Sequence, residues 1–442
     1  MEIDKKHIKT IRTQFGEMKT KEELLALFNY AKVVLYGEKA IPFSLNQLNY
    51  HYTPKANRKR YIQFIVKKKS GAERVISAPN NGLKEIQKCL NLVFQLVHEP
   101  NPAANGFVPG KSIVDNALIH AGSFYVYNID LKDFFPSIDQ ARVWGRLKKP
   151  PFNLNETQKR LDLANIIASL CCHEMEVERM DNTGAFVKVL KSVLPQGAPT
   201  SPTLSNVICE RLDIRLSGVA KRFGIKYSRY ADDITFSSMH NVYQKNSEFL
   251  TEISRIITDQ NFHIKESKTR LQKEGFRQEV TGLIVNEKVN VNKRYISDLR
   301  MWIYYWEQYG YEKASSFFKP SYIADKGHVK KGTPSLENVL AGKLEYLKMV
   351  KGKKNSVYLG LAERIKKLSS QSNPLNTVLL IWENQGIEKA MEYYYSNSKT
   401  ENEMIYEAFK QNVKAIKNMK IVLDENLSIE QALENIIKSL NK

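Results

Sequence analysis

The spacing of apolar residues predicts mixed helices and strands in the first two thirds of the chain and helices alone in the remainder. Residues 1–50 have the apolar spacing of helices with polar interruptions. Residues 60–79, RYIQFIVKKKSGAERVISAP, predict two strands around a basic Ser-Gly turn. From about residue 294 the pattern becomes wholly helical and more basic. The chain is therefore expected to join an α+β part to a helical part.

Between residues 80 and 290 the two kinds of periodicity follow one another. The segment GLKEIQKCLNLVFQLVHE predicts a helix with one apolar face, formed by Leu83, Ile86, Leu90, Val93 and Phe94. The segment SFYVYNIDLKDFFPSI predicts a strand that ends in acidic residues and a proline. The other expected elements are helices over 157–174, 203–223 and 247–260, a hairpin over 227–238, and two short strands in VTGLIVNEKVNVN.

Composition and charge narrow the class of protein. The chain has 442 residues, of which 42% are hydrophobic, so it can bury a core in two or three structural units. Its formal charge of +20 indicates a polyanionic partner, nucleic acid before membrane. The four cysteines form no CxxC pair, which argues against a zinc site or a disulfide framework. No apolar run approaches the roughly eighteen residues of a membrane span, so a cytoplasmic protein is expected.

Acidic residues at two strand ends are the first sign of chemistry. Asp232 and Asp233 occupy the turn of the hairpin SRYADDITFSS, and Asp130 ends the strand in YNIDLKDFFPSI. Taken alone, an Asp-Asp pair in a turn is as readily explained by a solvated turn as by a catalytic site. Two neighbouring strands could bring the three carboxylates together, and their repulsion would then require bound cations. Oxygen ligands of this kind suit Mg²⁺, and a pair of Mg²⁺ ions can clamp a phosphoryl displacement, which favours nucleotidyl transfer.

Five segments in a fixed order carry a family resemblance. They are NIDLKDFFPSI, LPQGAPTSPTLSN, YSRYADDITFS, FHIKESKTRL and VTGLIVN. In order and approximate spacing they resemble the motifs of reverse transcriptases, most of all the bacterial retron-type enzymes and their antiphage relatives. The resemblance covers roughly residues 50–370.

The resemblance implies the α+β fold of a right-hand polymerase, with an antiparallel palm sheet and helices. The expected divisions are an N-terminal helical region (1–50), fingers and palm (51–290), a helical thumb (291–370) and a small helical C-terminal extension (371–442). Within the thumb, the aromatic residues Trp302, Tyr304, Tyr305 and Trp306 are expected to be core rather than platforms for base stacking. Its Lys/Arg-rich helices are expected to follow a nucleic-acid backbone.

The same resemblance assigns the catalytic residues. Asp130, Asp232 and Asp233 would bind two Mg²⁺ ions, with the Leu131 carbonyl as a further ligand. Phe135 matches the steric gate under the sugar of the incoming nucleotide. An aromatic ring there leaves no room for a 2'-hydroxyl, so the expected product is DNA. The neighbouring Phe134 is expected to fill the core.

Four further residues are expected to contact the substrate. Gln196 lies in LPQGAPTSP, a proline-pinned loop before a helix, and would contact nucleotide and template. Lys68 and Arg74 belong to the basic flap VKKKSGAER and would contact the triphosphate. Lys268 matches a lysine near the leaving pyrophosphate, where it could act as a general acid. A plain surface lysine is the alternative for Lys268.

Two short strings and the C-terminus bear on the branch of the family. NALIH (116–120) and VTG (280–282) match signatures of retron enzymes, although neither string by itself requires RNA binding. A lone histidine in a helix is more often satisfied inside the protein. Residues 371–442 extend beyond the compact retron pattern. A non-retron defence-associated enzyme that makes long or repetitive cDNA therefore stays an alternative.

The expected function is RNA-directed DNA synthesis in antiphage defence. The partners implied by the resemblance are dNTPs, a noncoding RNA that serves as template and primer, the RNA–DNA hybrid, and an effector protein or a second copy of the chain. An RNA-dependent RNA polymerase is disfavoured by Phe135, and a group II intron enzyme by the lack of a His/Cys cluster after the thumb. An inactive RNA-binding module is disfavoured because all three carboxylates are present.

Overall fold

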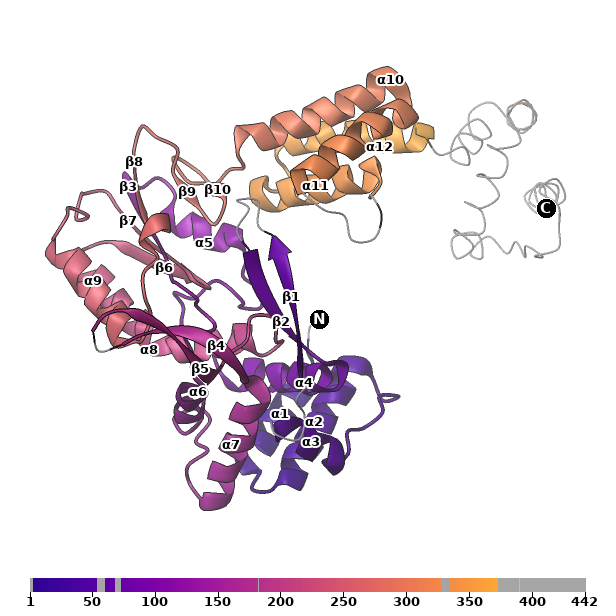
Figure 1. Cartoon of the computed structure of the whole chain (residues 1–442). Coiled ribbons are helices and arrows are strands. Elements are labelled where there is room, and N and C mark those ends of the chain that lie inside the picture. The colour runs from indigo at the N-terminus through magenta and orange to yellow at the C-terminus, as the bar shows by residue number, and fades with distance from the viewer. Residues whose placement is uncertain are drawn as a thin grey trace. The chain divides into compact units, whose positions relative to one another are not determined.

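The computed structural model describes residues 3–372, apart from 54–59, 68–72, 182, 327–331 and 333, together with residue 389. Its internal contacts divide the chain into two compact units, Met1–Asn290 and Val291–Lys442. The first unit combines helices with sheets, and the described part of the second is helical (Figure 1).

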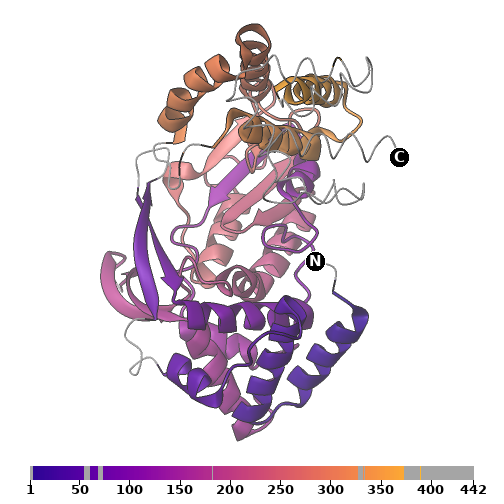
Figure 2. The ribbon, with the colours of Figure 1, turned by 90° about the vertical axis from the view of Figure 1, so that its right-hand side faces the viewer.

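Helices form a layer at the N-terminal end of the first unit (Figure 2). They are α1 (Lys5–Glu17), α2 (Lys21–Tyr36), α3 (Leu45–Tyr52) and α4 (Asn81–Val97). Capping boxes, in which a hydroxyl and a side chain three residues later bond each other's backbone, begin α2 at Thr20 and α3 at Ser44. The apolar face predicted for α4 is confirmed, because each of its five residues is at most 1% exposed.

A two-stranded ribbon rises from this layer (Figure 2). Strand β1 (Tyr61–Lys67) pairs antiparallel with β2 (Glu73–Pro79), as the sequence predicts. The backbone N–H of Ser77 donates to the carbonyl of Gln196 at 2.8 Å. The ribbon is therefore fastened to the loop of Gln196.

The main sheet has four antiparallel strands in the order β6-β7-β3-β8. These are β3 (Tyr125–Asp130), β6 (Lys226–Tyr230), β7 (Asp233–Ser238) and β8 (Arg270–Lys273). One face is apolar: Ile129, Ile234 and Phe236 are buried there, and the Phe236 ring packs edge-on against Phe249 of α9 (Glu248–Asp259). Helix α8 (Ser201–Arg222) packs against α9 and β6.

The opposite face of this sheet is polar, because the alternation of the strands places Asn128, Asp130, Asp233, Thr235 and Ser237 on it. Helix α5 (Ile113–His120) and the short strands β9 (Glu279–Val280) and β10 (Leu283–Ile284) lie together, and α5 contacts β6. The sheet therefore separates an apolar core from a polar recess.

Several elements of the first unit were not predicted, including two helices and three strands. Among them are α5 and α6 (Gln140–Leu147), strand β8, and the hairpin of β4 (His173–Met180) and β5 (Phe186–Val193). The helix expected over 157–174 is shorter, because α7 (Gln158–Cys171) ends just before β4 begins. The β4 sequence HEMEVERM does alternate, but only Val177 is buried, so the strand lacks the run of buried apolar residues that predicts a strand.

The described part of the second unit contains α10 (Lys293–Lys326), α11 (Leu336–Lys351) and α12 (Ser356–Ser372). Helix α10 is broken at Gly310, whose φ is 77°. Trp302 and Trp306 are buried, as expected, whereas Tyr304 is 51% exposed. The expectation that Tyr304 is core is wrong, because it projects from the other side of the helix. The predicted extension over 371–442 lies outside the described residues beyond Ser372, with Lys389 the exception.

Within the described ranges, no helix has the length and apolar character needed to span a membrane.

Candidate active site

The three aspartates predicted to be catalytic meet at one end of the polar sheet face. Asp130 is the last residue of β3 and Asp233 the first of β7, and the two are cross-strand partners. Asp232 lies in the turn between β6 and β7, and its carbonyl accepts a hydrogen bond from the Leu131 N–H at 3.1 Å. The sheet thus brings together residues that are about a hundred positions apart in the sequence.

Burial and the charge of neighbouring aspartates disfavour the ionised form of two of these three aspartates. Burial and the charges of Asp232 and Asp130 raise the pKa of Asp233 to about 6. Burial and the charge of Asp130 also raise the pKa of Asp232. The Asp233 side chain reaches solvent on one side, but protein surrounds it elsewhere and withdraws part of its water. A bound cation would relieve this repulsion.

Lys268 supplies one positive charge to the cluster. Its Nζ lies 2.5 Å from Oδ2 of Asp130, and its side chain is 49% exposed. The short 3₁₀ helix η1 (Glu266–Lys268) carries it, and the Lys265 N–H fixes that segment by donating to the Asp130 carbonyl at 2.8 Å. The lysine predicted near the leaving pyrophosphate is therefore an ion-pair partner of a predicted catalytic carboxylate.

A recess of about 580 Å³ opens in front of the carboxylates. Asp130, Asp233 and Arg270 line it from the sheet, while Thr281 and Gly282 line it from the β9–β10 turn. Thr281 has a φ of 48°, which is unusual for a β-branched residue. The VTG signature is thus brought to the mouth of the candidate site.

The carboxylate oxygens of the three aspartates are the type of donor that a hard divalent cation prefers. Among the described residues, no three His, Cys, Asp or Glu side chains converge closely enough to form a closed set of metal ligands. Asp130 is instead turned towards Lys268. The aspartates nevertheless supply only oxygen donors, and burial together with the charge of neighbouring aspartates raises the pKa of Asp232 and of Asp233. The residues therefore fit a hard divalent cation such as Mg²⁺ by the chemistry of their donor atoms, and their side chains would have to move to ligate it.

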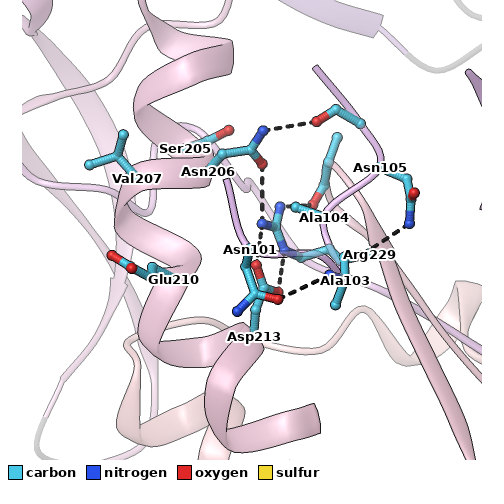
Figure 3. A network of polar contacts seen from close by, with 12 residues as sticks. Asn101, Ala103, Ala104, Asn105, Ser205, Asn206, Val207, Glu210, Asp213 and Arg229 are labelled. Atoms are coloured by element: carbon cyan, nitrogen blue, oxygen red, sulfur yellow. Dashed lines mark hydrogen bonds and ion pairs between the residues drawn. The ribbon is translucent and has the colours of Figure 1, made fainter. Parts of the chain in front are cut away.

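Behind the aspartates, a buried ion pair holds the turn (Figure 3). Arg229 of β6 and Asp213 of α8 are both 0% exposed, and their two hydrogen bonds measure 2.7 and 2.6 Å. Burial alone would lower the pKa of Arg229, but the Asp213 carboxylate raises it, so the guanidinium stays charged. The same guanidinium donates to the carbonyl of Ala231 at 3.1 Å. Ala231 precedes Asp232 and has a φ of 59°.

Sequence reasoning missed this pair, although one signal was present. Arg229 shares the face of the strand that carries Tyr227, and on the adjacent strand Ile234 and Phe236 occupy the same face. An arginine at such a position must be buried with a partner. The partner, Asp213, lies on a helix and could not be identified from the pattern of the strand.

The NALIH signature forms an internal hydrogen-bond chain. His120 is fully buried, with Nδ1 at 2.8 Å from the Ser237 hydroxyl and Nε2 at 2.7 Å from that of Ser228. Ser228 donates onward to Oδ1 of Asn116 at 2.7 Å, so its oxygen accepts from Nε2–H and Nδ1 accepts from Ser237. Burial, with a smaller effect of Lys226, lowers the pKa of His120 to about 3. The histidine is therefore a neutral, hydrogen-bonded link between α5 and the hairpin of β6 and β7.

Replacing His120 with alanine is expected to lower the free energy of unfolding by about 1–3 kcal/mol, because buried hydroxyls lose their partner. The pKa of His120 is about 3 in the folded protein and about 6.5 in the unfolded chain. Its stabilising contribution is therefore full above pH about 6.5 and is lost as the pH falls towards 3. Urea denaturation between pH 7.5 and 4 should show a wild-type-minus-variant difference that shrinks with acidity. The exposed His240 provides the control, and a pH-independent difference would contradict this assignment.

Three of the four remaining predicted contacts lie among the described residues. Phe135 is half-buried, and its ring centroid lies 5.3 Å from that of Phe134, which is 4% exposed and fills the core as expected. Gln196 is half-buried in the loop bonded to β2. Arg74 is exposed on β2, and its charge acts on Asp232. Lys68 lies outside the described residues.

Comparison with known proteins identifies the family. The model of the family "Reverse transcriptase (RNA-dependent DNA polymerase)" matches residues 66–290. This chain therefore belongs to the reverse transcriptase family, and it is of the retron type.

Three curated relatives support the retron type. The retron Mx162 reverse transcriptase of Myxococcus xanthus is 40% identical over 239 residues, which cover 51% of this chain and 47% of the relative. The retron Mx65 enzyme of the same organism is 35% identical, covering 55% and 56%. The retron Ec86 enzyme of Escherichia coli is 34% identical, covering 56% and 70%. The matches thus span about half the length of the two Myxococcus relatives.

Similar solved structures include the telomerases of two Candida species. The apo telomerase of Candida tropicalis, truncated from its C-terminal domain, gives a TM-score of 0.34 at 12% identity, covering 56% of this chain and 60% of that one. The telomerase of Candida albicans with a TWJ fragment of telomeric RNA gives 0.36 at 10% identity, covering 88% and 78%.

Proposed function

We propose that this protein is the RNA-directed DNA polymerase of a retron and copies a cognate noncoding RNA into DNA in antiphage defence. One observation carries the proposal: the cross-strand pair Asp130–Asp233, with Asp232 in the adjoining turn, in a chain that matches the reverse transcriptase family over residues 66–290. The charge of +20 supports a nucleic-acid partner.

Asp130, Asp232 and Asp233 would hold two Mg²⁺ ions, with the Leu131 carbonyl as a further ligand. When bound, such ions stabilise the negative charge that develops in phosphoryl transfer. The protein's own part is to fix the carboxylates. The sheet pairs Asp130 with Asp233, and the Arg229 guanidinium holds the backbone before Asp232.

Other side chains of the protein bind the incoming nucleotide. Arg74 and Lys68 bind the triphosphate of the incoming dNTP, and Gln196 contacts its base and the template. Lys268 holds a positive charge beside Asp130, from where its ammonium group can give a proton to the leaving pyrophosphate. Phe135 lies under the sugar and excludes a 2'-hydroxyl, so the product is DNA.

The rest of the chain positions the nucleic acid. Residues 51–290 act as fingers and palm, and residues 291–370 as a thumb whose basic helices follow the backbone of the RNA or hybrid. The noncoding RNA provides the template, and one of its own 2'-hydroxyls primes synthesis. For residues 371–442 the proposed roles are packing on the thumb, binding of the noncoding RNA, or self-association.

The decisive experiment isolates the protein with its nucleic acid. The full chain is purified from cells that carry its native locus, beside an Asp232→Ala/Asp233→Ala double variant, and the bound RNA and DNA are sequenced. We expect one short DNA, complementary to one copurifying RNA and joined to it at an internal guanosine, only with the wild type. Long or repetitive DNA without that branch would instead favour a non-retron defence enzyme. Absence of any aspartate-dependent DNA would overturn the proposal.

The role in defence has its own readout. At least one phage of a broad panel should form fewer plaques on cells that carry the native locus. The comparison is with cells that carry the locus with the double variant. Equal plaque counts across the panel would contradict the antiphage role and leave the polymerase assignment intact.

A further inference from the structure

Phe107 connects the predicted steric gate, Phe135, to the turn between β6 and β7 that carries Asp232. This turn is named the catalytic turn. Phe107 follows Gly106 in the segment NPAANGF (101–107), which is called the brace loop below and lies between α4 and α5. Its φ of 61° is uncommon for a bulky aromatic residue. Its ring is 39% exposed, yet the ring centroid lies 6.1 Å from that of Phe135. A strained, partly exposed aromatic residue beside a substrate-binding group suggests a functional constraint.

The brace loop is bonded along the strand that leads into the catalytic turn (Figure 3). The Arg229 N–H donates to the Ala103 carbonyl at 2.9 Å, and the Asn105 N–H donates to the Arg229 carbonyl at 2.8 Å. The side chain of Asn206, which also accepts from Arg229, donates to the Gly106 carbonyl at 2.9 Å. The buried ion pair therefore anchors both the turn and this loop.

Gly106 brings the loop into direct contact with the turn. A Cβ added at Gly106 would lie 2.5 Å from the backbone nitrogen of Ala231 and about 3 Å from the backbone of Tyr230. No side chain fits in that space. The backbone next to Phe107 therefore rests against the two residues that precede Asp232.

Two aromatic rings lie next to Phe135. One is Phe134, which is buried and stacks on Phe262 with centroids 5.6 Å apart. The other is Phe107, which is partly exposed. Because burial holds Phe134 in place, we expect loss of the Phe107 ring to give the half-buried Phe135 ring access to other rotamers.

We propose that Phe107 is a positioning residue for sugar discrimination, which holds the Phe135 ring where it excludes a 2'-hydroxyl. The inference rests on the proposed DNA polymerase function and adds to it a residue that acts through the gate. The brace loop fixes Phe107 to the same hairpin that carries Asp232 and Asp233. The positions of the gate and of the proposed catalytic carboxylates therefore depend on the same hairpin, and such shared support keeps a site pre-organised.

The test is single-nucleotide extension of a DNA primer on an RNA template whose next base is uracil. The rate constant kcat and the Michaelis constant KM are measured with dATP and with ATP in excess Mg²⁺. The proteins are the wild type and the variants Phe107→Ala, Phe107→Tyr, Phe135→Ala, Phe107→Ala/Phe135→Ala and Phe276→Ala. Phe276 is a phenylalanine of the same unit that is 74% exposed, and it serves as the matched control.

We expect Phe107→Ala to reduce the preference for dATP over ATP by about tenfold, the scale on which side-chain packing sets a pocket's discrimination. The change should come from better use of ATP, with kcat for dATP little altered. Phe107→Tyr should restore the preference, because it keeps the ring. Phe107→Ala should add little in the Phe135→Ala background, because its effect passes through the gate.

Three results would overturn the inference while the wild type is active with dATP. They are an unchanged preference in Phe107→Ala, an equal loss of dATP and ATP use with a lowered melting temperature, and full additivity with Phe135→Ala. Wild-type protein that incorporates neither nucleotide on this template would overturn the proposed function, and the inference with it.

Discussion

Replacing Asp233 with asparagine is expected to abolish DNA synthesis and to raise the melting temperature of the metal-free protein. Activity should fall by at least about a thousandfold, because a charged donor for the metal ions is lost from the site that stabilises the transition state. Stability should rise because Asn removes a charge that burial, Asp232 and Asp130 disfavour. The same side chain thus costs stability and provides function.

The pH dependence follows from the pKa of Asp233. That pKa is about 6 in the folded protein and about 3.9 in the unfolded chain. The folded state therefore binds more protons between these values, and the destabilising contribution of Asp233 grows as the pH rises from about 4 to about 6. Above pH 6 it is fully present. The variant should exceed the wild type in melting temperature at pH 7.5, and the difference should vanish near pH 4.

Differential scanning fluorimetry with and without Mg²⁺ measures this prediction. Mg²⁺ should raise the melting temperature of the wild type more than that of Asp233→Asn, because a ligand stabilises the state that binds it. Asp162→Asn, at an exposed position on α7, is the control and should follow the wild type. An Asp233→Asn protein with wild-type activity, or one that melts lower at pH 7.5, would contradict the assigned role of the cluster.

Breaking the buried pair Arg229–Asp213 is expected to have the largest effect on stability. Both side chains are 0% exposed, so Arg229→Met leaves an uncompensated carboxylate inside the protein. Such changes cost about 3–5 kcal/mol. Arg229→Met/Asp213→Leu should recover part of this loss, because an apolar pair carries no buried charge. The recovery is incomplete because the Tyr227 hydroxyl loses Asp213 as its acceptor.

Activity should not recover with stability. In the double variant no guanidinium bonds the Ala231 carbonyl, and Asn206 loses one of its partners. The turn before Asp232 is then free to relax from its positive φ. We expect a folded protein whose primer extension stays at least about tenfold below wild type, the scale of loss from misplaced catalytic groups.

Urea denaturation and primer extension on the same preparations separate the two effects. The matched control is Arg215→Met on α8, because Arg215 pairs with Asp259 at the surface. Its cost should stay within about 1 kcal/mol. Full activity in the double variant would show that the pair serves folding alone.

The sequence by itself determined the elements whose signals are local. Alternating apolar residues predicted β1, β2, β3 and the hairpin of β6 and β7, and apolar residues at helical spacing predicted α4, α8 and α9. Ordered motifs were sufficient to indicate a reverse transcriptase, which the comparisons confirm. The strand and helix patterns can be recognised in the sequence because they relate residues only two to four positions apart.

The tertiary structure decided what those residues contact. Only strand pairing places Asp130 opposite Asp233, and only the packing of α8 against β6 gives Arg229 its partner. NALIH matched a family signature, yet its histidine proved to be a neutral internal tie. Phe107 had no sequence signal, because its contact with Phe135 joins loops 28 residues apart. Buried polar groups and strained loops draw their energy from long-range partners, and chain order alone does not specify those partners.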